Sequence, residues 1–201
     1  MNFAEYNVKD ANLEEVLLAL KSLDTVEAVA LGGSRSTGAS DENSDYDIYV
    51  YCAEIPTAET RENLLGKYCS IAEFGNHYWE SEDNTVMNNG VPVDIIYREV
   101  DRFGRYIDTV IKGGKAFNGY TTAFWHSKVL FDKTGNFTKF RDMAQIDFPE
   151  NLRSAIIKNN RNLLNGKLPS YDRQIKKAQE RGDIVSVNHR ITAFLESYFD
   201  V

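Results

Sequence analysis

Apolar and polar positions recur with two different periods over the first part of the chain. Within residues 10–23 the apolar residues that recur at helical spacing predict an amphipathic helix; they are Leu13, Val16, Leu17 and Leu20. Residues 26–31 form a short apolar run, and residues 46–51 place apolar side chains on one face, so both are predicted to be strands. A further helix is expected after Pro56, because proline is favoured where a helix begins.

A strong turn signal at Asn88-Asn89-Gly90 separates two apolar runs. The runs 85–87 and 91–97 are therefore predicted to pair as a β-hairpin. Farther along the chain, the apolar spacing predicts a helix over 98–112, a short strand over 129–131, and helices over about 150–164, 170–181 and 183–201.

The character of these elements changes near residue 146, from mixed helices and strands to helices alone. We therefore expect an α+β fold, in which a mixed sheet flanked by helices is followed by a helical C-terminal domain. The two domains are assigned to residues 1–145 and 146–201. The last helix is still amphipathic at Val201 and has no stop signal, so we expect that the chain is truncated or that this helix packs on something absent from the sequence.

The composition is that of a folded globular protein. The 201 residues are 42% hydrophobic and 26% charged, which is enough apolar material for a core. No apolar run approaches the roughly 18 residues needed to cross a bilayer, and the N-terminus lacks the apolar segment of a secretory signal. Cys52 and Cys69 show neither metal-ligand spacing nor a disulfide framework, so we expect a reduced, cytoplasmic setting.

Charge is divided unevenly along the chain, although the formal net charge is only −7. Residues 1–97 hold 18 Asp and Glu against 5 Lys and Arg, whereas residues 98–201 hold 12 against 18. The acidic part can hold cations and the basic part can meet an anionic partner, although solvated surface charge explains both equally well. Because no dense Lys/Arg stripe is present, a large duplex nucleic acid is not an expected partner.

The candidate chemistry begins where the strand over 26–31 ends, at Gly33-Ser34. Glycine lets the backbone approach a ligand closely, and successive N–H groups form an anion-binding nest that suits phosphate. After a polar loop come Asp45 and Asp47, whose i, i+2 spacing on a strand places both carboxylates on one face. Two carboxylates held close together repel each other, and hard oxygen ligands beside phosphates suit Mg²⁺.

Asp94 lies inside the apolar run 91–97, where a charge has no packing role. If this strand pairs beside Asp45 and Asp47, the three carboxylates converge and can hold two metal ions that clamp the attacking and leaving oxygens of an in-line displacement. In that arrangement Asp94 is the natural group to accept a proton from an acceptor hydroxyl.

These elements resemble the signature of the DNA polymerase beta-like nucleotidyltransferase superfamily, in which an apolar strand, Gly-Ser, a loop and Asp-x-Asp precede a third carboxylate on a later strand. Gly33-Ser34, Asp45-Tyr46-Asp47 and Asp94 supply these parts. The resemblance covers about residues 20–100. The segment from Arg181-Gly182-Asp183 to the end is similar to the helical C-terminal domain of small antibiotic-modifying and uncharacterised bacterial members.

The resemblance implies a role for each of these residues. Ser34 and the neighbouring amides, with Gly33, would bind the β and γ phosphates of a nucleoside triphosphate, while Asp45 and Asp47 would ligate Mg²⁺ and Asp94 would serve as both ligand and base. Two Mg²⁺ ions are expected. Arg35 follows the phosphate loop and can touch the triphosphate, with a solvated surface position as the alternative.

The leading hypothesis is a transferase that moves AMP from ATP to a hydroxyl of a small molecule such as an antibiotic and releases pyrophosphate. The acidic balance and the short chain favour a small acceptor. A second hypothesis keeps the chemistry but changes the acceptor to a protein or a tRNA, as in toxin–antitoxin nucleotidyltransferases, and the basic C-terminal half favours it. The third is a catalytically silent nucleotide-binding regulatory module, whose expected sign is the loss of one carboxylate.

Overall fold

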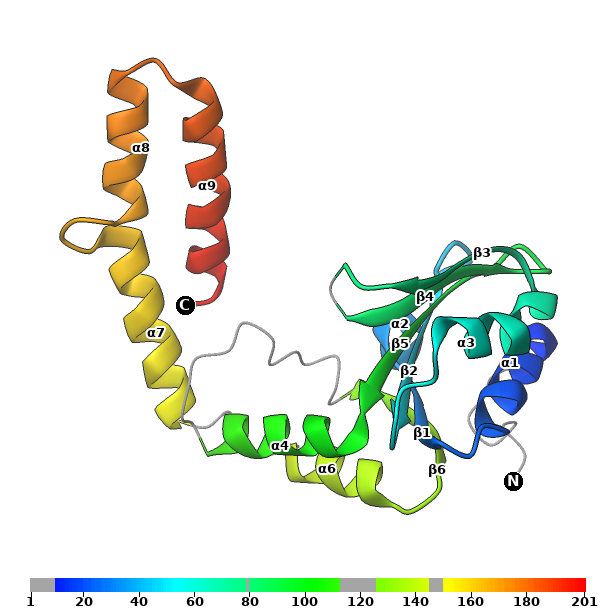
Figure 1. Cartoon of the computed structure of the whole chain (residues 1–201). Helices are drawn as coiled ribbons and strands as arrows, with labels where there is room; N and C mark the ends of the chain where they lie inside the picture. The colour runs from blue at the N-terminus through cyan, green and yellow to red at the C-terminus, as the bar shows by residue number, and fades with distance from the viewer. Residues whose placement is uncertain (1–9, 79, 113–125, 145–149) are drawn as a thin grey trace. The chain divides into compact units, whose positions relative to one another are not determined.

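The computed structural model describes residues 10–78, 80–112, 126–144 and 150–201. The chain divides into two compact units, one of residues 1–107 and 121–145 and the other of residues 108–120 and 146–201. The first unit holds the sheet and the second holds the C-terminal helices (Figure 1).

A six-stranded sheet forms the centre of the first unit, with the strand order β3-β4-β5-β2-β1-β6. The β2–β5 pair is parallel, whereas the other neighbouring pairs are antiparallel, so the sheet is mixed. The strands are β1 (Val26–Leu31), β2 (Tyr46–Cys52), β3 (Cys69–Asn76), β4 (Ser81–Met87), β5 (Pro92–Glu99) and β6 (Lys128–Asp132). This sheet and the helices around it confirm the predicted α+β class.

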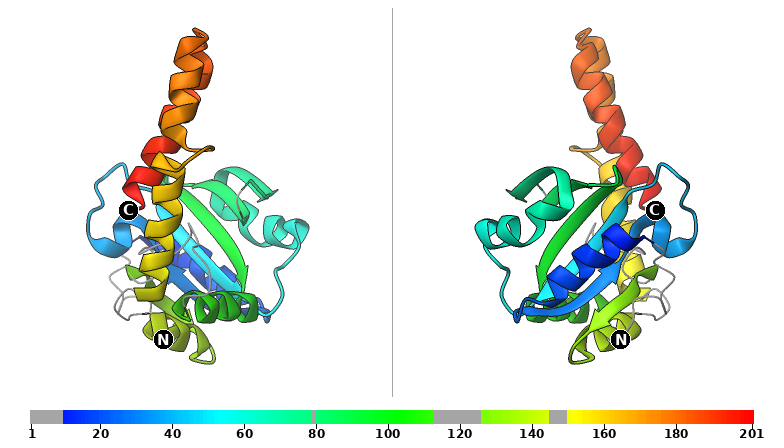
Figure 2. Two further views of the ribbon diagram at one scale, coloured as in Figure 1. Left: turned by 90° about the vertical axis from the view of Figure 1, so that its left-hand side faces the viewer. Right: turned by 90° about the vertical axis from the view of Figure 1, so that its right-hand side faces the viewer.

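One face of the sheet is closed by α1 (Ala11–Lys21) and α3 (Ala58–Leu65), as Figure 2 shows. The apolar stripe of α1 packs there because its leucines recur at helical spacing, and the Asp10 carboxylate caps the helix start. We call this the closed face; its core side chains are fully or almost fully buried and include Leu13, Leu17, Leu20, Val29, Ile48, Val50, Leu65, Met87, Val93 and Ile95.

The opposite face is only partly covered by helices of its own unit, and we call it the open face. Tyr51 on β2 is buried there against Phe103 of α4 (Val100–Ile111) and Phe137 of α6 (Asn136–Ala144), with ring centroids 5.0 Å and 4.2 Å away. Toward the start of β2, every second side chain from Asp47 is only half-buried. The period of two along a strand thus sends apolar residues to the core and polar ones to the open face.

Over the described residues 150–201, the second unit contains the helices α7 (Glu150–Asn165), α8 (Tyr171–Glu180) and α9 (Ile184–Phe199), of which α8 and α9 lie side by side (Figure 1). Gly182 has a φ of 69° and ends the preceding helix, and Asp183 caps α9 by accepting from the Ser186 N–H at 3.0 Å. In the part of the chain that the structure describes, no helix has the length and apolar character to cross a membrane.

The predicted helices and strands are confirmed, including the hairpin between β4 and β5. Four elements of the described residues were not predicted: β3, α6, the short helix α2 (Gly33–Thr37) and the 3-10 helix η2 (Gly66–Tyr68). Most of β3 is exposed at the edge of the sheet, so its sequence lacks the regular apolar alternation of a half-buried strand. The helix α6 is short and follows directly on the turn at Gly135, whose polar residues concealed its start.

Candidate active site

A single row of residues crosses the open face and carries the candidate chemistry. Asp47 on β2 is the direct register partner of Asp94 on β5, and Asp94 is in turn the partner of Asn84 on β4. The row continues to the end of β1, where the Gly32 N–H donates to the Asp47 carbonyl oxygen at 2.8 Å. Because directly paired residues point to the same face, the two carboxylates lie next to each other.

The glycines after β1 lie against this row. Gly33 has a φ of +59°, and a Cβ at this position would overlap the Asp47 carboxylate. A Cβ on Gly32 would meet the ring of Tyr49 in the same way. The Gly32-Gly33 pair therefore lets the loop lie directly on the open face, where any side chain would push it off.

Ser34 lies in the first turn of the short helix α2 (Gly33–Thr37), directly after this close approach. The hydroxyls of Ser36 and Thr37 donate to the carbonyl oxygens of Gly33 and Ser34 at 2.8 Å and 3.0 Å. Gly38 ends the helix with a φ of 81°. These contacts hold the backbone around Ser34 in one tight turn beside Asp47.

Arg35 is engaged with the loop that leads into β2. Its Nε donates to the Asp45 carbonyl oxygen at 2.8 Å, and its Nη2 donates to the Ser44 carbonyl oxygen at 2.5 Å. The guanidinium group also stacks on the ring of Tyr46, 4.1 Å from its centroid. In this arrangement Arg35 fixes the backbone that carries Asp45, and contact with a triphosphate stays a prediction.

The three aspartates are placed unequally. Asp47 and Asp94 are held side by side by strand pairing, whereas Asp45 precedes β2 and is not held by the ladder. Within the described residues, no group of three or more His, Cys, Asp or Glu side chains is arranged as a metal site. The register therefore brings together two of the predicted ligands, and the full three-carboxylate site stays a prediction.

The electrostatics of the row are dominated by negative charge. The pKa of Asp47 is raised above its ordinary value of 3.8, first by burial and then by the charges of Asp45 and Asp94. Since the causes include two neighbouring acids and no cationic partner, the site favours a bound cation or a proton on one carboxylate.

Two asparagines complete the row and were missed by the sequence reasoning. Asn84 donates from Nδ2 to Asp94 Oδ1 at 2.9 Å, and Asn76 donates to Asn84 Oδ1. A period-two reading of β4 places Asn84 opposite the core-facing Asp83 and Thr85, so the pattern alone could have assigned it to the open face. Its contact with Asp94 needed the register of β5.

A positively charged residue lies farther along the same face. Arg98 on β5 pairs with both carboxylate oxygens of Glu80, at 2.6 Å and 2.7 Å, and its guanidinium group lies 4.7 Å from the Tyr49 ring centroid. Burial alone would lower the pKa of Arg98, but the Glu80 carboxylate and the Tyr51 hydroxyl, which accepts from Arg98 Nη1 at 3.3 Å, raise it above its ordinary value. Glu80 neutralises this charge, so the open face remains acidic beside Asp47.

Comparison with known protein families shows the family to which this chain belongs. The nucleotidyltransferase domain family matches residues 13–116, slightly more than half of the chain. The chain belongs to this family, within the DNA polymerase beta-like nucleotidyltransferase superfamily, and is a nucleotidyltransferase. The matched segment contains the glycine loop, the three aspartates and both asparagines. No match was found among curated proteins.

Proposed function

We propose that this protein transfers a nucleoside monophosphate, AMP from ATP, to a hydroxyl of a small-molecule acceptor such as an antibiotic, with Mg²⁺ and with release of pyrophosphate. The observation that supports it most is the register pairing of Asp47 with Asp94 directly beside the Gly33 backbone. A paired set of carboxylates next to a close backbone approach is what a metal-bound triphosphate requires.

The donor set fits Mg²⁺. Asp47 and Asp94 supply hard oxygen ligands, and Asp45 lies close enough to raise the pKa of Asp47. A cation there offsets the mutual repulsion of the carboxylates. When bound, Mg²⁺ would neutralise charge on the triphosphate and polarise its α-phosphate.

In this proposal the glycine loop binds the β and γ phosphates of the nucleotide, which leave as pyrophosphate. Gly33 and Ser34 offer backbone N–H groups and a hydroxyl within one tight turn, and the absence of a side chain at Gly33 lets the phosphates come close to Asp47. Arg35 contributes by holding the loop that carries Asp45.

Asp94 acts as the base in this proposal. It takes the proton of the acceptor hydroxyl as the oxygen forms a bond to the α-phosphorus, and the bond between the α-phosphorus and the bridging oxygen breaks to release pyrophosphate. Its hydrogen bond from Asn84 occupies Oδ1. The second carboxylate, Asp47, would serve as a ligand of the Mg²⁺ that binds the nucleotide.

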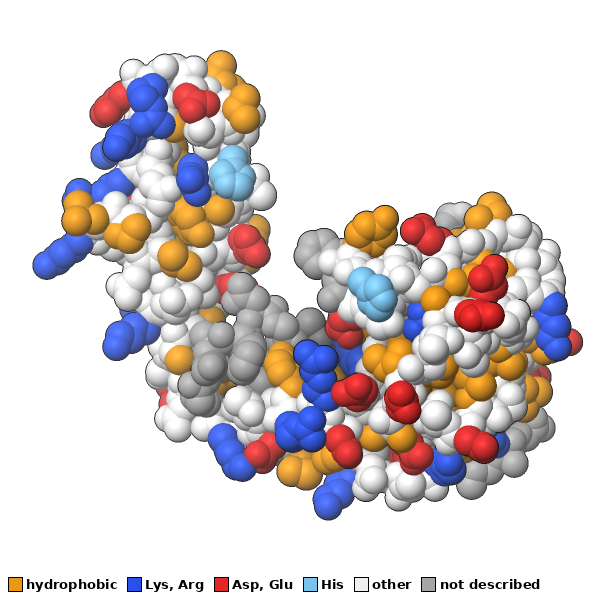
Figure 3. Space-filling view, viewed as in Figure 1, with side chains coloured by type: hydrophobic (Ala, Val, Ile, Leu, Met, Phe, Trp, Pro, Cys, Tyr) orange, Lys and Arg blue, Asp and Glu red, His pale blue; other side chains and the backbone are white. Residues whose placement is uncertain are grey.

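The charge of the catalytic unit supports the proposed acceptor class. An acidic surface around the row disfavours a long polyanion, which supports a small or cationic acceptor. A protein or tRNA acceptor is the second candidate, because basic side chains are spread over the helical unit in Figure 3 and Lys176 and Lys177 on α8 are exposed. We assign residues 1–145 to catalysis and propose that 146–201 contribute to acceptor choice.

A labelling experiment tests the proposal. The protein is incubated with ATP labelled at the α-phosphate, Mg²⁺ and one of four acceptors: an aminoglycoside, a lincosamide, bulk tRNA or a protein lysate. We expect label on an antibiotic, with pyrophosphate release, and no transfer in EDTA. Label on tRNA or protein would replace the small acceptor, and absence of transfer to every acceptor with either ATP or GTP would contradict the proposal.

A further inference from the structure

We infer that Asn84 is a positioning residue for Asp94, set by a hydrogen-bonded relay from Asn76, and that the relay is anchored by the buried Arg61–Asp83 pair on the other face of the sheet. The inference rests on the proposed function, because it assigns the relay to the carboxylate that acts as base. It names three contacts outside the Gly-Ser and Asp-x-Asp motifs.

The relay crosses three strands in one direction. Asn76 on β3 donates to Asn84 Oδ1, and Asn84 on β4 donates to Asp94 Oδ1 on β5 at 2.9 Å. Asn84 and Asp94 are also direct register partners, so their side chains start from neighbouring backbone positions. Strand pairing fixes the backbone at each step, and the hydrogen bonds restrain the otherwise broad last torsion of each amide, which makes this a defined connection.

The Asp94 carboxylate, as a hydrogen-bond acceptor, sets the orientation of both asparagine amides. An ionised carboxylate only accepts, so Asn84 must present its NH₂ group to Asp94 and its oxygen to Asn76. Asn76 must then present its NH₂ group to Asn84. Asn76 is 9% exposed, and among the described residues its Oδ1 has no hydrogen-bond partner. The relay therefore places the NH₂ group of Asn76 on Asn84 although its own buried oxygen gains no partner.

A bulge in β3 places Asn76 at this point. The pairing of β3 with β4 shifts register between Glu73 and Asn76, and Gly75 has a φ of +79°. The Gly75 N–H donates to Asp83 Oδ1 at 2.8 Å, on the closed face. The residue after Gly75 is thereby turned to the open face, where its amide reaches Asn84.

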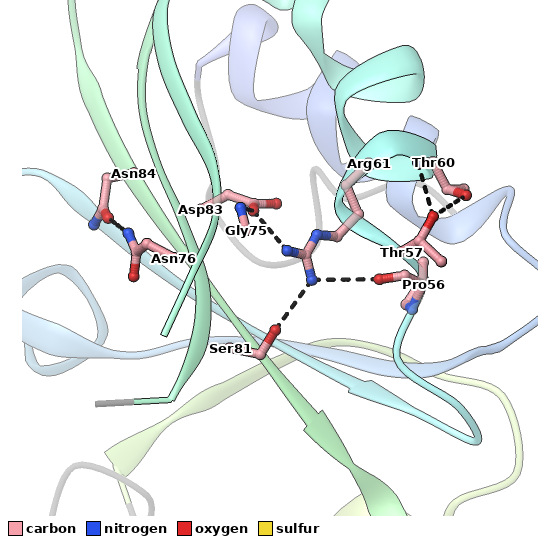
Figure 4. Close-up of polar contacts among 9 residues, drawn as sticks. All are labelled: Pro56, Thr57, Thr60, Arg61, Gly75, Asn76, Ser81, Asp83 and Asn84. Atoms are coloured by element: carbon pink, nitrogen blue, oxygen red, sulfur yellow. Dashed lines mark hydrogen bonds and ion pairs between the residues drawn. The ribbon is translucent and has the colours of Figure 1, made fainter. Parts of the chain in front are cut away.

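Asp83 is itself fixed from the closed face, as Figure 4 shows. Arg61 of α3 pairs with Asp83 Oδ1 at 3.0 Å and donates to Ser81 Oγ at 3.1 Å. Arg61 and Asp83 are 2% and 0% exposed. The guanidinium group also lies 4.4 Å from the Tyr97 ring centroid. A buried pair with several partners moves little, so it holds the bulge and with it the relay.

The consequence for Asp94 is a fixed carboxylate plane. The last torsion of an aspartate is broad when nothing restrains it, and the charge of Asp47 would otherwise push the Asp94 carboxylate aside. A donor on Oδ1 holds the plane and keeps the second oxygen available for the acceptor hydroxyl or a cation. Without Asn84, the base is present but misdirected.

The test compares two variants of β4 that each remove a 2.9 Å side-chain hydrogen bond to β5. Asn84→Leu removes the donor to Asp94 on the open face. Thr85→Val removes the bond from Thr85 Oγ1 to the Val93 carbonyl oxygen on the closed face. Two properties are measured for both variants and the wild type: the kcat and KM for ATP, from pyrophosphate release with the best acceptor of the labelling panel, and the affinity for Mn²⁺, from its electron paramagnetic resonance signal.

We expect Asn84→Leu to lower kcat about 10–100-fold with little change in the KM for ATP, and to weaken Mn²⁺ binding, as loss of a contact that orients a ligand does. Asn84→Asp, which keeps the size but replaces the donor by an acceptor, should lower kcat likewise. Thr85→Val should retain wild-type values. A kcat and Mn²⁺ affinity of Asn84→Leu equal to those of Thr85→Val would overturn the inference. If the wild type transfers no label, the proposed function fails, and the Mn²⁺ titrations decide the positioning role alone.

Discussion

The two faces of the sheet surround a carboxylate with opposite charges. On the closed face, Asp83 is fully buried and meets Arg61 at 3.0 Å. On the open face, Asp47 meets two further carboxylates, Asp45 and Asp94. Burial raises the pKa of both groups above the ordinary value. For Asp83, the Gly75 N–H and the Arg61 guanidinium group offset part of this rise, whereas for Asp47 the neighbouring carboxylates add to it. The paired carboxylate supports the fold, whereas we propose that the carboxylates without a cationic partner bind a ligand.

The largest expected effect separates activity from folding. Asp47→Asn and Asp94→Asn should each lower transfer by about 10³-fold or more, because they remove a ligand and the base respectively. Circular dichroism in EDTA should match the wild type, and the melting temperature should be no lower than that of the wild type, since no favourable ion pair is removed and a repulsive charge is. Transfer that survives both substitutions would contradict the assignment of the row.

On the closed face, a substitution in the Arg61–Asp83 pair is expected to change stability. Arg61→Met leaves Asp83 buried without its cation and should lower the free energy of unfolding by about 3–5 kcal/mol in urea denaturation. The double variant Arg61→Met with Asp83→Leu should recover much of this loss, because neither charge is then buried alone. A single variant as stable as the wild type would show that the pair does not anchor β3 and β4.

A matched pair of glycine substitutions tests the close approach. Gly33→Ala and Gly38→Ala both place a side chain at positive φ, which costs about 1–2 kcal/mol. Only at Gly33 would the new Cβ overlap Asp47, since the Gly38 position is open. We expect both variants to lose stability and only Gly33→Ala to lose transfer and Mn²⁺ binding as well. Equal activity in the two variants would remove the basis for a nucleotide at this loop.

The smallest expected effect is a pH dependence in EDTA. The folded-state pKa of Asp47 is raised above 3.8. Its contribution to stability is therefore complete below the unfolded pKa and is lost as the pH rises through the folded pKa. Asp47→Asn should remove this decline and be more stable than the wild type at neutral pH, by no more than about 1 kcal/mol because solvent screens a half-buried charge. A steeper decline in the variant, measured by urea denaturation between about pH 3 and pH 8, would contradict the sign.

Sequence patterns predicted most of the fold because its core elements are strongly periodic. The apolar stripe of α1 and the alternation of apolar and polar residues in β2 and β5 arise because each element is buried on one side. The edge strand β3 is mostly exposed, so its sequence shows no comparable alternation of apolar and polar residues. The same absence concealed Asn76, which owes its position to the bulge at Gly75 and not to any local spacing.

The candidate site was predictable in its motifs but not in its contacts. Gly33 could be named because it follows an apolar strand, Asp47 because of its i, i+2 spacing from Asp45, and Asp94 because it interrupts an apolar run. Their alignment depends on the parallel register of β2 and β5, which no short-range pattern encodes. Arg35 shows the other limit, since its guanidinium group holds the Ser44 and Asp45 carbonyl oxygens, a contact that spacing alone does not indicate.

Calorimetric titration of ATP tests the central claim most directly. Wild-type protein and Asp94→Asn are each titrated with ATP in Mg²⁺ and again in EDTA, with Thr85→Val as the control. We expect ATP binding that requires Mg²⁺ in the wild type and in Thr85→Val, and an affinity at least about tenfold weaker in Asp94→Asn. Binding of the same strength in EDTA, or in the Asp94 variant with Mg²⁺, would show that the paired carboxylates are not the metal-dependent nucleotide site.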